Sequence, residues 1–68
     1  MKNNTAPLTK REHEILAALA QGLLYKEIAS SLSISLDTVK KHCKNIYQKL
    51  KVRNRTEATN YFNSRKAA

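Results

Sequence analysis

The sequence contains few of the residues that carry disulfide, metal and nucleotide-loop chemistry. Its 68 residues include one cysteine, one glycine, one proline and no tryptophan. The lone cysteine, Cys43, excludes an internal disulfide and a cysteine-rich zinc site, and it suits a reducing, cytoplasmic setting. The lone glycine, Gly22, excludes a glycine-rich loop around a nucleotide phosphate. A chain of this length suits one compact domain.

Long apolar runs are also missing. No run approaches the ~20 residues of a membrane-spanning helix, and the start "MKNNTAP" lacks the apolar segment of a signal peptide. We therefore expect a cytoplasmic protein without a membrane-spanning segment. The polar start and the frayed end "NSRKAA" would equally suit a domain cut from a longer chain.

Neither histidine is placed for catalysis or for metal binding. His42 precedes Cys43, so on a helix their side chains diverge by ~100° and cannot act as a base and nucleophile pair. His13 lies between Glu12 and Glu14 and is most simply a solvated polar residue. No cluster offers the ligand set of a zinc site. We expect no enzyme activity, no metal and no cofactor.

Acidic residues are scarce, and basic residues are in large excess. The chain has 5 Asp and Glu against 13 Lys and Arg, for a net charge of +8. After Thr38 the only acidic side chain is Glu57, against nine Lys and Arg. This imbalance indicates a polyanionic partner, but nucleic acid and anionic membrane surfaces attract such a protein alike. The pattern of the residues has to decide between them.

Signals for helix ends predict two helices in the first half of the chain and give no sign of strands. Thr9 and Glu12 form a capping box for a helix over about 10–21, which ends at Gly22. A second helix is predicted over about 25–32. Its start has no side-chain cap, because Leu24 takes the cap position.

Two further helices follow from the same signals. Ser35 caps a helix over about 36–50, and Asn54 caps a last helix over about 55–63. The predicted fold class is all-α. The expected division of the chain is a flexible leader at 1–7, one domain at 8–63 and a disordered tail at 64–68.

The predicted helix over 36–50 separates apolar from basic side chains. At ~100° per residue, one arc of about 100° collects the expected core residues Leu36, Val39, Cys43, Ile46, Tyr47 and Leu50. The other side collects Lys40, Lys41, Lys44 and Lys51, with Asp37 and Gln48 among them. The remaining expected core residues are Ile15, Leu16, Leu19, Leu23, Ile28, Ala29, Leu32, Ala58 and one of Tyr61 and Phe62.

A short helix, a tight turn and a longer helix with a basic outer face form the layout of a helix-turn-helix, whose second helix enters the DNA major groove. The lysines would then face phosphates and base edges. A basic helix face is also a common solvated surface, and charge alone does not separate the two interpretations. The turn geometry favours DNA.

Four blocks of the sequence resemble the LuxR/FixJ/NarL class of helix-turn-helix domains: "LTKREHEIL", "KEIASSLSIS", "TVKKHCKNIYQKL" and "VRNRTEA". The resemblance runs from Leu8 to about Ala58. It implies a four-helix bundle with a central helix-turn-helix, of the LuxR C-terminal-like, winged-helix-like type. It also implies specific binding to duplex DNA in transcriptional regulation, commonly as the C-terminal output domain of a two-component response regulator. An N-terminal receiver or sensor domain and RNA polymerase are the further partners it implies.

The resemblance gives roles to single residues. It implies base contacts by Lys40, Lys41 and Lys44. It implies phosphate contacts by Lys26, Thr38, Lys49 and Arg55, and Tyr25 is a further candidate phosphate contact although it departs from the family pattern. Dimer contacts on DNA are implied for the last helix, at Thr59 and at whichever of Tyr61 and Phe62 faces outward.

Three of these assignments have alternatives within the chain. Tyr25, which with Leu24 departs from the Ser or Thr followed by Asn common in the family, would either donate to a phosphate or pack its ring at the helix start. Lys49 would either contact phosphate or cover the edge of the core. Arg55 would alternatively form an ion pair with Glu12.

Other classes of protein explain less of the sequence. The segment "YKEIA" also resembles region 4 of sigma factors, but the following "NIYQKLKVRNRTEA" does not fit that region. A small RNA-binding protein is a further alternative, although the usual aromatic stacking platform is missing. A membrane-surface helix would need the apolar face that the core requires. A protein-interaction module without nucleic acid remains open.

Overall fold

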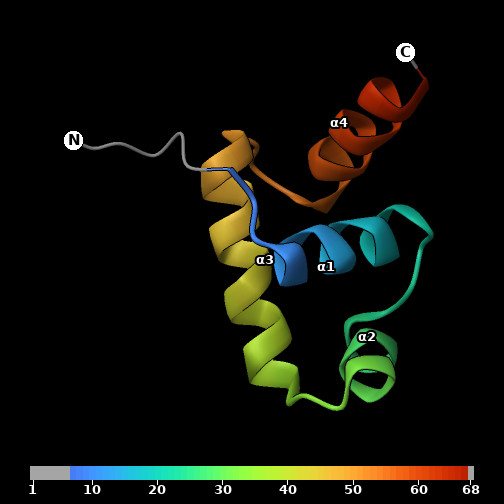
Figure 1. Cartoon of the computed structure of the whole chain (residues 1–68), viewed down its shortest axis with the longest axis vertical. Helices are drawn as coiled ribbons and strands as arrows, with labels where there is room; N and C mark the ends of the chain where they lie inside the picture. Colours follow the sequence, from blue (N-terminus) through green and yellow to red (C-terminus); the bar gives the residue numbers. More distant parts are fainter. Residues whose placement is uncertain (1–6, 68) are drawn as a thin grey trace.

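The computed structural model describes residues 7–67, which form four helices and no strands. The helices are α1 (Lys10–Ala20), α2 (Tyr25–Leu32), α3 (Leu36–Leu50) and α4 (Arg55–Ala67) (Figure 1). The predicted all-α class is confirmed. The last helix continues beyond the predicted end at 63, so most of the expected tail at 64–68 is helical; residues 1–6 of the expected leader and residue 68 lie outside the described residues.

The first two helices start as their sequences predict. Thr9 Oγ1 accepts from the Glu12 N–H at 3.1 Å, and Glu12 Oε1 accepts from the Thr9 N–H at 2.9 Å, which completes the capping box. At α2 only half of this arrangement exists. The Glu27 carboxylate accepts from the Leu24 N–H at 2.7 Å, but leucine has no oxygen to accept in return.

The last two helices have side-chain caps. Ser35 Oγ accepts from the Thr38 N–H at 3.0 Å at the start of α3. Asn54 Oδ1 accepts from the Glu57 N–H at 3.0 Å at the start of α4. Each oxygen satisfies an N–H that has no partner within its helix.

The first three helices end in one hydrogen-bond pattern. Each has a residue with positive φ just after its last turn: Gly22 at 90°, Ser33 at 58° and Lys51 at 59°. The following N–H then donates back to a carbonyl of the last turn, from Leu23 to Ala18, from Ile34 to Ala29 and from Val52 to Tyr47. This is the Schellman motif, whose apolar last residue packs back onto the helix. Leu23, Ile34 and Val52 all pack against the core.

The core is made by all four helices. Its buried apolar residues are Ile15, Leu16, Leu19, Ile28, Ala29, Val39, Cys43, Ile46 and Ala58, all of which were predicted. The prediction for Leu36 is wrong, because this residue is 41% exposed. It lies in the first turn of α3 and is not among the residues that pack against the core. Phe62 packs against the core, whereas Tyr61 is exposed.

The helices leave one long side of α3 uncovered. α1 packs against both α3 and α4, and α2 packs against α3. Figure 1 shows α1, α2 and α4 together on one side of α3, with no helix on its other side. None of the helices in the described part of the chain is long and apolar enough to cross a membrane.

Candidate nucleic-acid interface

The uncovered side of α3 and the residue that ends it carry a row of lysines, which we call the lysine stripe: Lys40, Lys41 and Lys44 on the helix and Lys51 just after it. All four side chains are exposed. The ion pairs in the described part of the chain are Arg11–Glu14 and Lys49–Glu12, so none of the four stripe lysines forms an ion pair with a described carboxylate. The three predicted base-contact lysines are thus brought together on one face of one helix.

The dimensions of α3 suit a major groove. Its 15 residues span about 22 Å at ~1.5 Å per residue. A helix with its side chains is about 10–12 Å wide, which matches the ~12 Å width of the groove in B-DNA. The other helices lie on one side of α3, so its opposite side is left open to a groove (Figure 1).

The turn before α3 holds the two helices of the motif in a fixed relation. Ser33 ends α2 in the left-handed conformation, Ile34 packs against the core, and Ser35 caps α3. The chain therefore changes direction over three residues, and the turn is held by the end of α2 on one side and by the cap of α3 on the other. This is the helix-turn-helix geometry that the sequence predicted.

The predicted phosphate contacts at the starts of α2 and α3 differ in the exposure and the hydrogen bonding of their side chains. Lys26 is exposed in the first turn of α2. Thr38 is half-buried, and its hydroxyl lies 2.8 Å from Ser35 Oγ within the cap.

Tyr25 packs its ring at the start of α2, one of the two alternatives that the sequence left open. The ring contacts the core, and the Arg55 guanidinium carbon lies 5.9 Å from the ring centroid, within cation–π range. The Tyr25 hydroxyl lies 3.1 Å from the Tyr47 hydroxyl. Burial raises the pKa of Tyr25, and the hydrogen bond with Tyr47 adds to this. The hydroxyl therefore stays protonated at neutral pH.

Lys49 is engaged inside the chain. Its ammonium lies 2.7 Å from Glu12 Oε1 and 3.4 Å from the Pro7 carbonyl oxygen. Burial would raise the pKa of the Glu12 carboxyl, but hydrogen bonds from Lys49 and Thr9 and the charge of Lys49 outweigh it and lower that pKa. The alternative of an ion pair between Glu12 and Arg55 is wrong, because α3 rather than α4 supplies the cation.

Arg55 joins the start of α4 to the end of α1. Its Nη2 donates to the Leu19 carbonyl at 3.3 Å and also to the Leu23 carbonyl. These carbonyls belong to the last turn of α1 and to the loop before α2. Arg55 therefore serves the packing of three helices at once.

The comparison with known sequences decides the family. The profile described as "Bacterial regulatory proteins, luxR family" matches residues 6–62. The chain belongs to the LuxR family. This confirms the predicted functional class, a helix-turn-helix domain for DNA binding in transcriptional regulation.

Individual LuxR-family relatives are similar over most of this chain. The nitrate/nitrite response regulator protein NarP of Escherichia coli K12 is 51% identical over 90% of the chain and 28% of its own length. The transcriptional regulatory protein LnrK of Bacillus subtilis 168 is 52% identical over 87% of the chain and 27% of its own length. The chain therefore spans less than a third of these relatives.

A solved structure agrees with the sequence comparison. The response regulator ChrA of a heme-sensing two-component system aligns with a TM-score of 0.83 and 43% identity. The alignment covers 93% of this chain and 31% of ChrA. The fold seen here is thus that of a LuxR-family domain.

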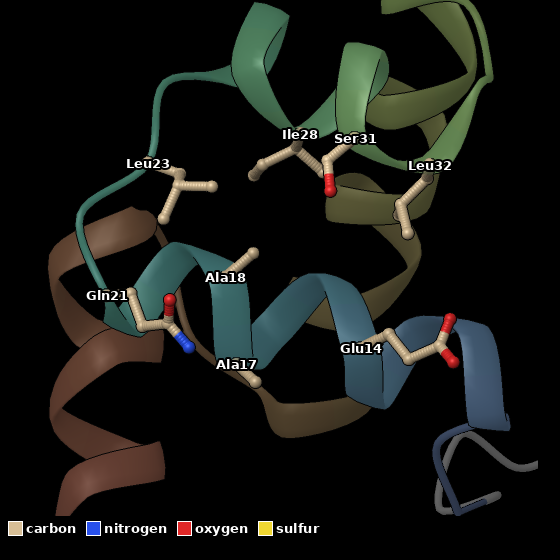
Figure 2. A pocket seen from close by; sticks show the side chains of 8 residues that line it. All are labelled: Glu14, Ala17, Ala18, Gln21, Leu23, Ile28, Ser31 and Leu32. Carbon is tan, nitrogen blue, oxygen red and sulfur yellow. The ribbon is translucent and has the colours of Figure 1, made fainter.

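A groove between α1 and α2 lies apart from the lysine stripe. Figure 2 shows its lining side chains, which come from α1, α2 and the loop between them. They are Glu14, Ala17, Ala18, Gln21, Leu23, Ile28, Ser31 and Leu32. None is basic, so this groove does not extend the cationic surface of the LuxR-family domain.

The candidate dimer residues on α4 separate into two kinds. Thr59 is half-buried, and Tyr61 is exposed. Phe62 packs against the core and so is not the outward-facing aromatic residue of the pair.

Two features of the site were missed from the sequence. Tyr47 was assigned to the core alone, whereas its hydroxyl meets that of Tyr25. Its position on the helical wheel, at the boundary between the apolar arc and the lysines, was the available signal. The second is Asp37, an exposed carboxylate on the same side of α3 as the lysines, to which the sequence patterns assign no role.

Proposed function

We propose that this chain binds a specific double-stranded DNA sequence through α3 and acts as the output domain of a transcriptional response regulator. The observation that carries this proposal is the lysine stripe, whose exposed cations lack internal acidic partners on the uncovered side of the second helix of a helix-turn-helix. A duplex supplies the missing counter-charge as two rows of phosphates along the groove.

Lys40, Lys41 and Lys44 are the proposed base contacts. Their exposure along successive turns of α3 supports this role, because the inner side of a helix in the major groove reaches base edges. Each ammonium can donate to the O6 and N7 atoms of guanine.

Lys26, Thr38 and Tyr25 are the proposed phosphate contacts. Lys26 supplies a free ammonium at the start of α2, and Thr38 a hydroxyl at the start of α3. The Tyr25 hydroxyl can donate to a phosphate oxygen when the Tyr47 hydroxyl is the donor of the Tyr25–Tyr47 pair.

Lys49 and Arg55 serve mainly to hold the fold under this proposal. The Lys49 ammonium is paired with Glu12, and the Arg55 Nη2 is bonded to two carbonyls. Either cation would have to give up an internal partner to bind DNA with the same atoms.

We propose DNA binding and no catalysis for this domain. Cys43 is 2% exposed, and burial raises the pKa of its thiol, so the reactive thiolate is suppressed. Among residues 7–67 no three His, Cys, Asp or Glu side chains lie close enough together to hold a metal ion.

The wider context follows from the relatives. NarP and ChrA are named as response regulators, and this chain matches less than a third of each. We propose that a receiver or sensor domain precedes this domain in the complete protein, and that RNA polymerase is a further partner at the promoter. We propose that the domain acts in the cytoplasm, because bacterial DNA lies there.

The proposed oligomer is a homodimer formed on DNA through α4. Thr59 and Tyr61 are the contact residues, while Phe62 supports the helix from the core side. A two-fold symmetric dimer would require an operator with approximate two-fold symmetry. Tyr61→Ser should leave binding to one half-site unchanged and remove cooperative binding to the full operator.

The test is selection of duplexes from a randomised pool by this domain. The enriched sequence is then titrated at two salt concentrations beside an unrelated duplex and a structured RNA. We expect a short, nearly palindromic motif that binds at least about 10³-fold more tightly than the unrelated duplex. Equal binding to all three polyanions would contradict the proposal, and preference for the RNA would indicate the RNA-binding alternative.

A further inference from the structure

One carboxylate stands within the lysine stripe without an internal partner. Asp37 is the second residue of α3, and its side chain is exposed. Neither of the described ion pairs includes it, and no described hydrogen bond uses its carboxylate. At ~100° per residue it points within about 20° of the direction of Lys44 and about 40° of that of Lys41.

Such a carboxylate opposes DNA binding by simple charge. If the lysine stripe faces a major groove, Asp37 faces the same groove and is repelled by the phosphates. The helix dipole favours an acidic residue in the first turn. Positions 36 and 38 lie in the same turn and point away from the stripe, but the acidic residue stands at 37. The position of Asp37 on the stripe therefore calls for a partner in the groove itself.

The base edges in the major groove offer few partners for a carboxylate. Guanine presents two acceptors, and thymine presents an acceptor and a methyl group, so both repel or fail to satisfy it. Adenine places an acceptor beside its amino group. Cytosine presents the N4 amino group alone, which is the donor that Asp and Glu side chains accept from.

We propose that Asp37 is a base-reading residue, whose carboxylate accepts a hydrogen bond from the N4 amino group of one cytosine in each half-site. The inference rests on the proposed DNA-binding function. Residues at the N-terminal end of a recognition helix meet base edges, and Asp37 is the acidic residue there. The lysines on the same face read guanine, so the stripe combines donors with one acceptor.

This arrangement raises specificity at the expense of affinity. A sequence without the cytosine leaves the carboxylate desolvated and repelled by the neighbouring acceptors. Non-specific binding is weakened for the same reason. A protein with net charge +8 would otherwise bind any duplex.

The test repeats the duplex selection with the wild-type domain, Asp37→Asn and Asp37→Ala. Wild type should select cytosine at one position of each half-site and lose about 5-fold to 150-fold in affinity when that base pair is changed. Asp37→Asn should select adenine there, because an amide pairs with adenine N6 and N7. Asp37→Ala should show no preference at that position and should bind unrelated duplex more tightly than wild type.

Glu14→Gln is the matched control, since it removes one exposed carboxylate from α1 without touching α3. It should leave the base preference unchanged at every position. Identical selected motifs for wild type and both Asp37 variants would overturn this inference while leaving the proposed function intact. If wild type selects no motif, the proposed function fails first and this inference fails with it. Circular dichroism of each variant shows that a changed motif does not come from lost helix.

Discussion

Glu12 is the one charged residue among the buried residues of the described chain, and it shows how the charges are divided. Glu12, Lys49 and Arg55 direct their polar atoms inward and have partners within the fold. The stripe lysines direct theirs outward and have none. Basic residues therefore have two roles, in holding the fold and in facing outward, and the partners of each side chain in the structure distinguish them.

The Glu12–Lys49 pair should make stability depend on pH. The folded-state pKa of Glu12 lies below its ordinary value of 4.5, so its contribution is complete above that pH and is lost as the pH falls through the folded-state pKa. Glu12→Gln should be less stable at pH 7 by about 1–3 kcal/mol, and its free energy of unfolding should fall less steeply between about pH 5 and pH 3. Urea denaturation at a series of pH values measures both. Parallel curves for the two proteins would contradict the assigned role of this pair.

Arg55 should contribute to stability through its two carbonyl partners. Arg55→Ala should lower the free energy of unfolding by about 1.5–3 kcal/mol, because hydrogen bonds from a charged donor are lost. Arg55→Lys should recover little of this, since an ammonium lacks the planar fork of the guanidinium. Arg53→Ala, at an exposed position two residues earlier, should change the free energy by less than about 0.5 kcal/mol. Denaturant titration of the three variants tests the assignment, which fails if Arg53 and Arg55 behave alike.

At the scale of the helices, local signals predicted most boundaries. α2 and α3 begin and end where the sequence predicts, although Ser33 and Lys51, the left-handed residues that end them, are not residue types that signal a helix end. The predicted end of α4 at 63 is wrong, because the helix continues to Ala67 and no glycine or proline stops it. No local signal shows which of Phe62 and Tyr61 faces the core, because these neighbouring residues point only about 100° apart on the helix.

Substitutions at two of the Schellman motifs should change the stability in opposite directions. Gly22→Ala should lower stability by about 1 kcal/mol, because the added Cβ meets no neighbour but the positive φ of 90° disfavours an L-residue. Ser33→Gly should raise stability by up to about 1 kcal/mol, since glycine adopts the left-handed conformation without that cost. Thermal or urea unfolding of the two variants measures the difference. Stability changes of the same sign in both variants would show that the left-handed conformation does not determine the stability of these turns.

At the scale of the whole molecule, the sequence predicted the functional class better than it predicted the contacts between helices. The lysine stripe follows from the helical period alone, so Lys40, Lys41 and Lys44 could be assigned to one face in advance. The Glu12–Lys49 pair and the exposure of Leu36 depend on how α1, α2 and α3 cross. The period of one helix gives the direction of a side chain and not the element that it meets.

Salt dependence should reveal the phosphate contacts of the whole domain. Each phosphate that is neutralised adds about 0.9 to the slope of log affinity against log salt. Lys26→Ala should lower this slope by about 1 and weaken binding equally on the selected operator and on unrelated duplex. A loss confined to the operator would instead make Lys26 a base contact.

The most direct test of the central claim, that the lysine stripe reads bases, compares Lys44→Ala with Lys10→Ala. Lys10 is an exposed lysine at the start of α1 and so controls for the loss of one positive charge. Both variants are titrated with the selected operator and with unrelated duplex at one salt concentration. We predict that Lys44→Ala loses about 1–3 kcal/mol on the operator and little on the unrelated duplex, whereas Lys10→Ala changes both slightly and equally. An equal loss on both duplexes for Lys44→Ala would contradict base reading by α3.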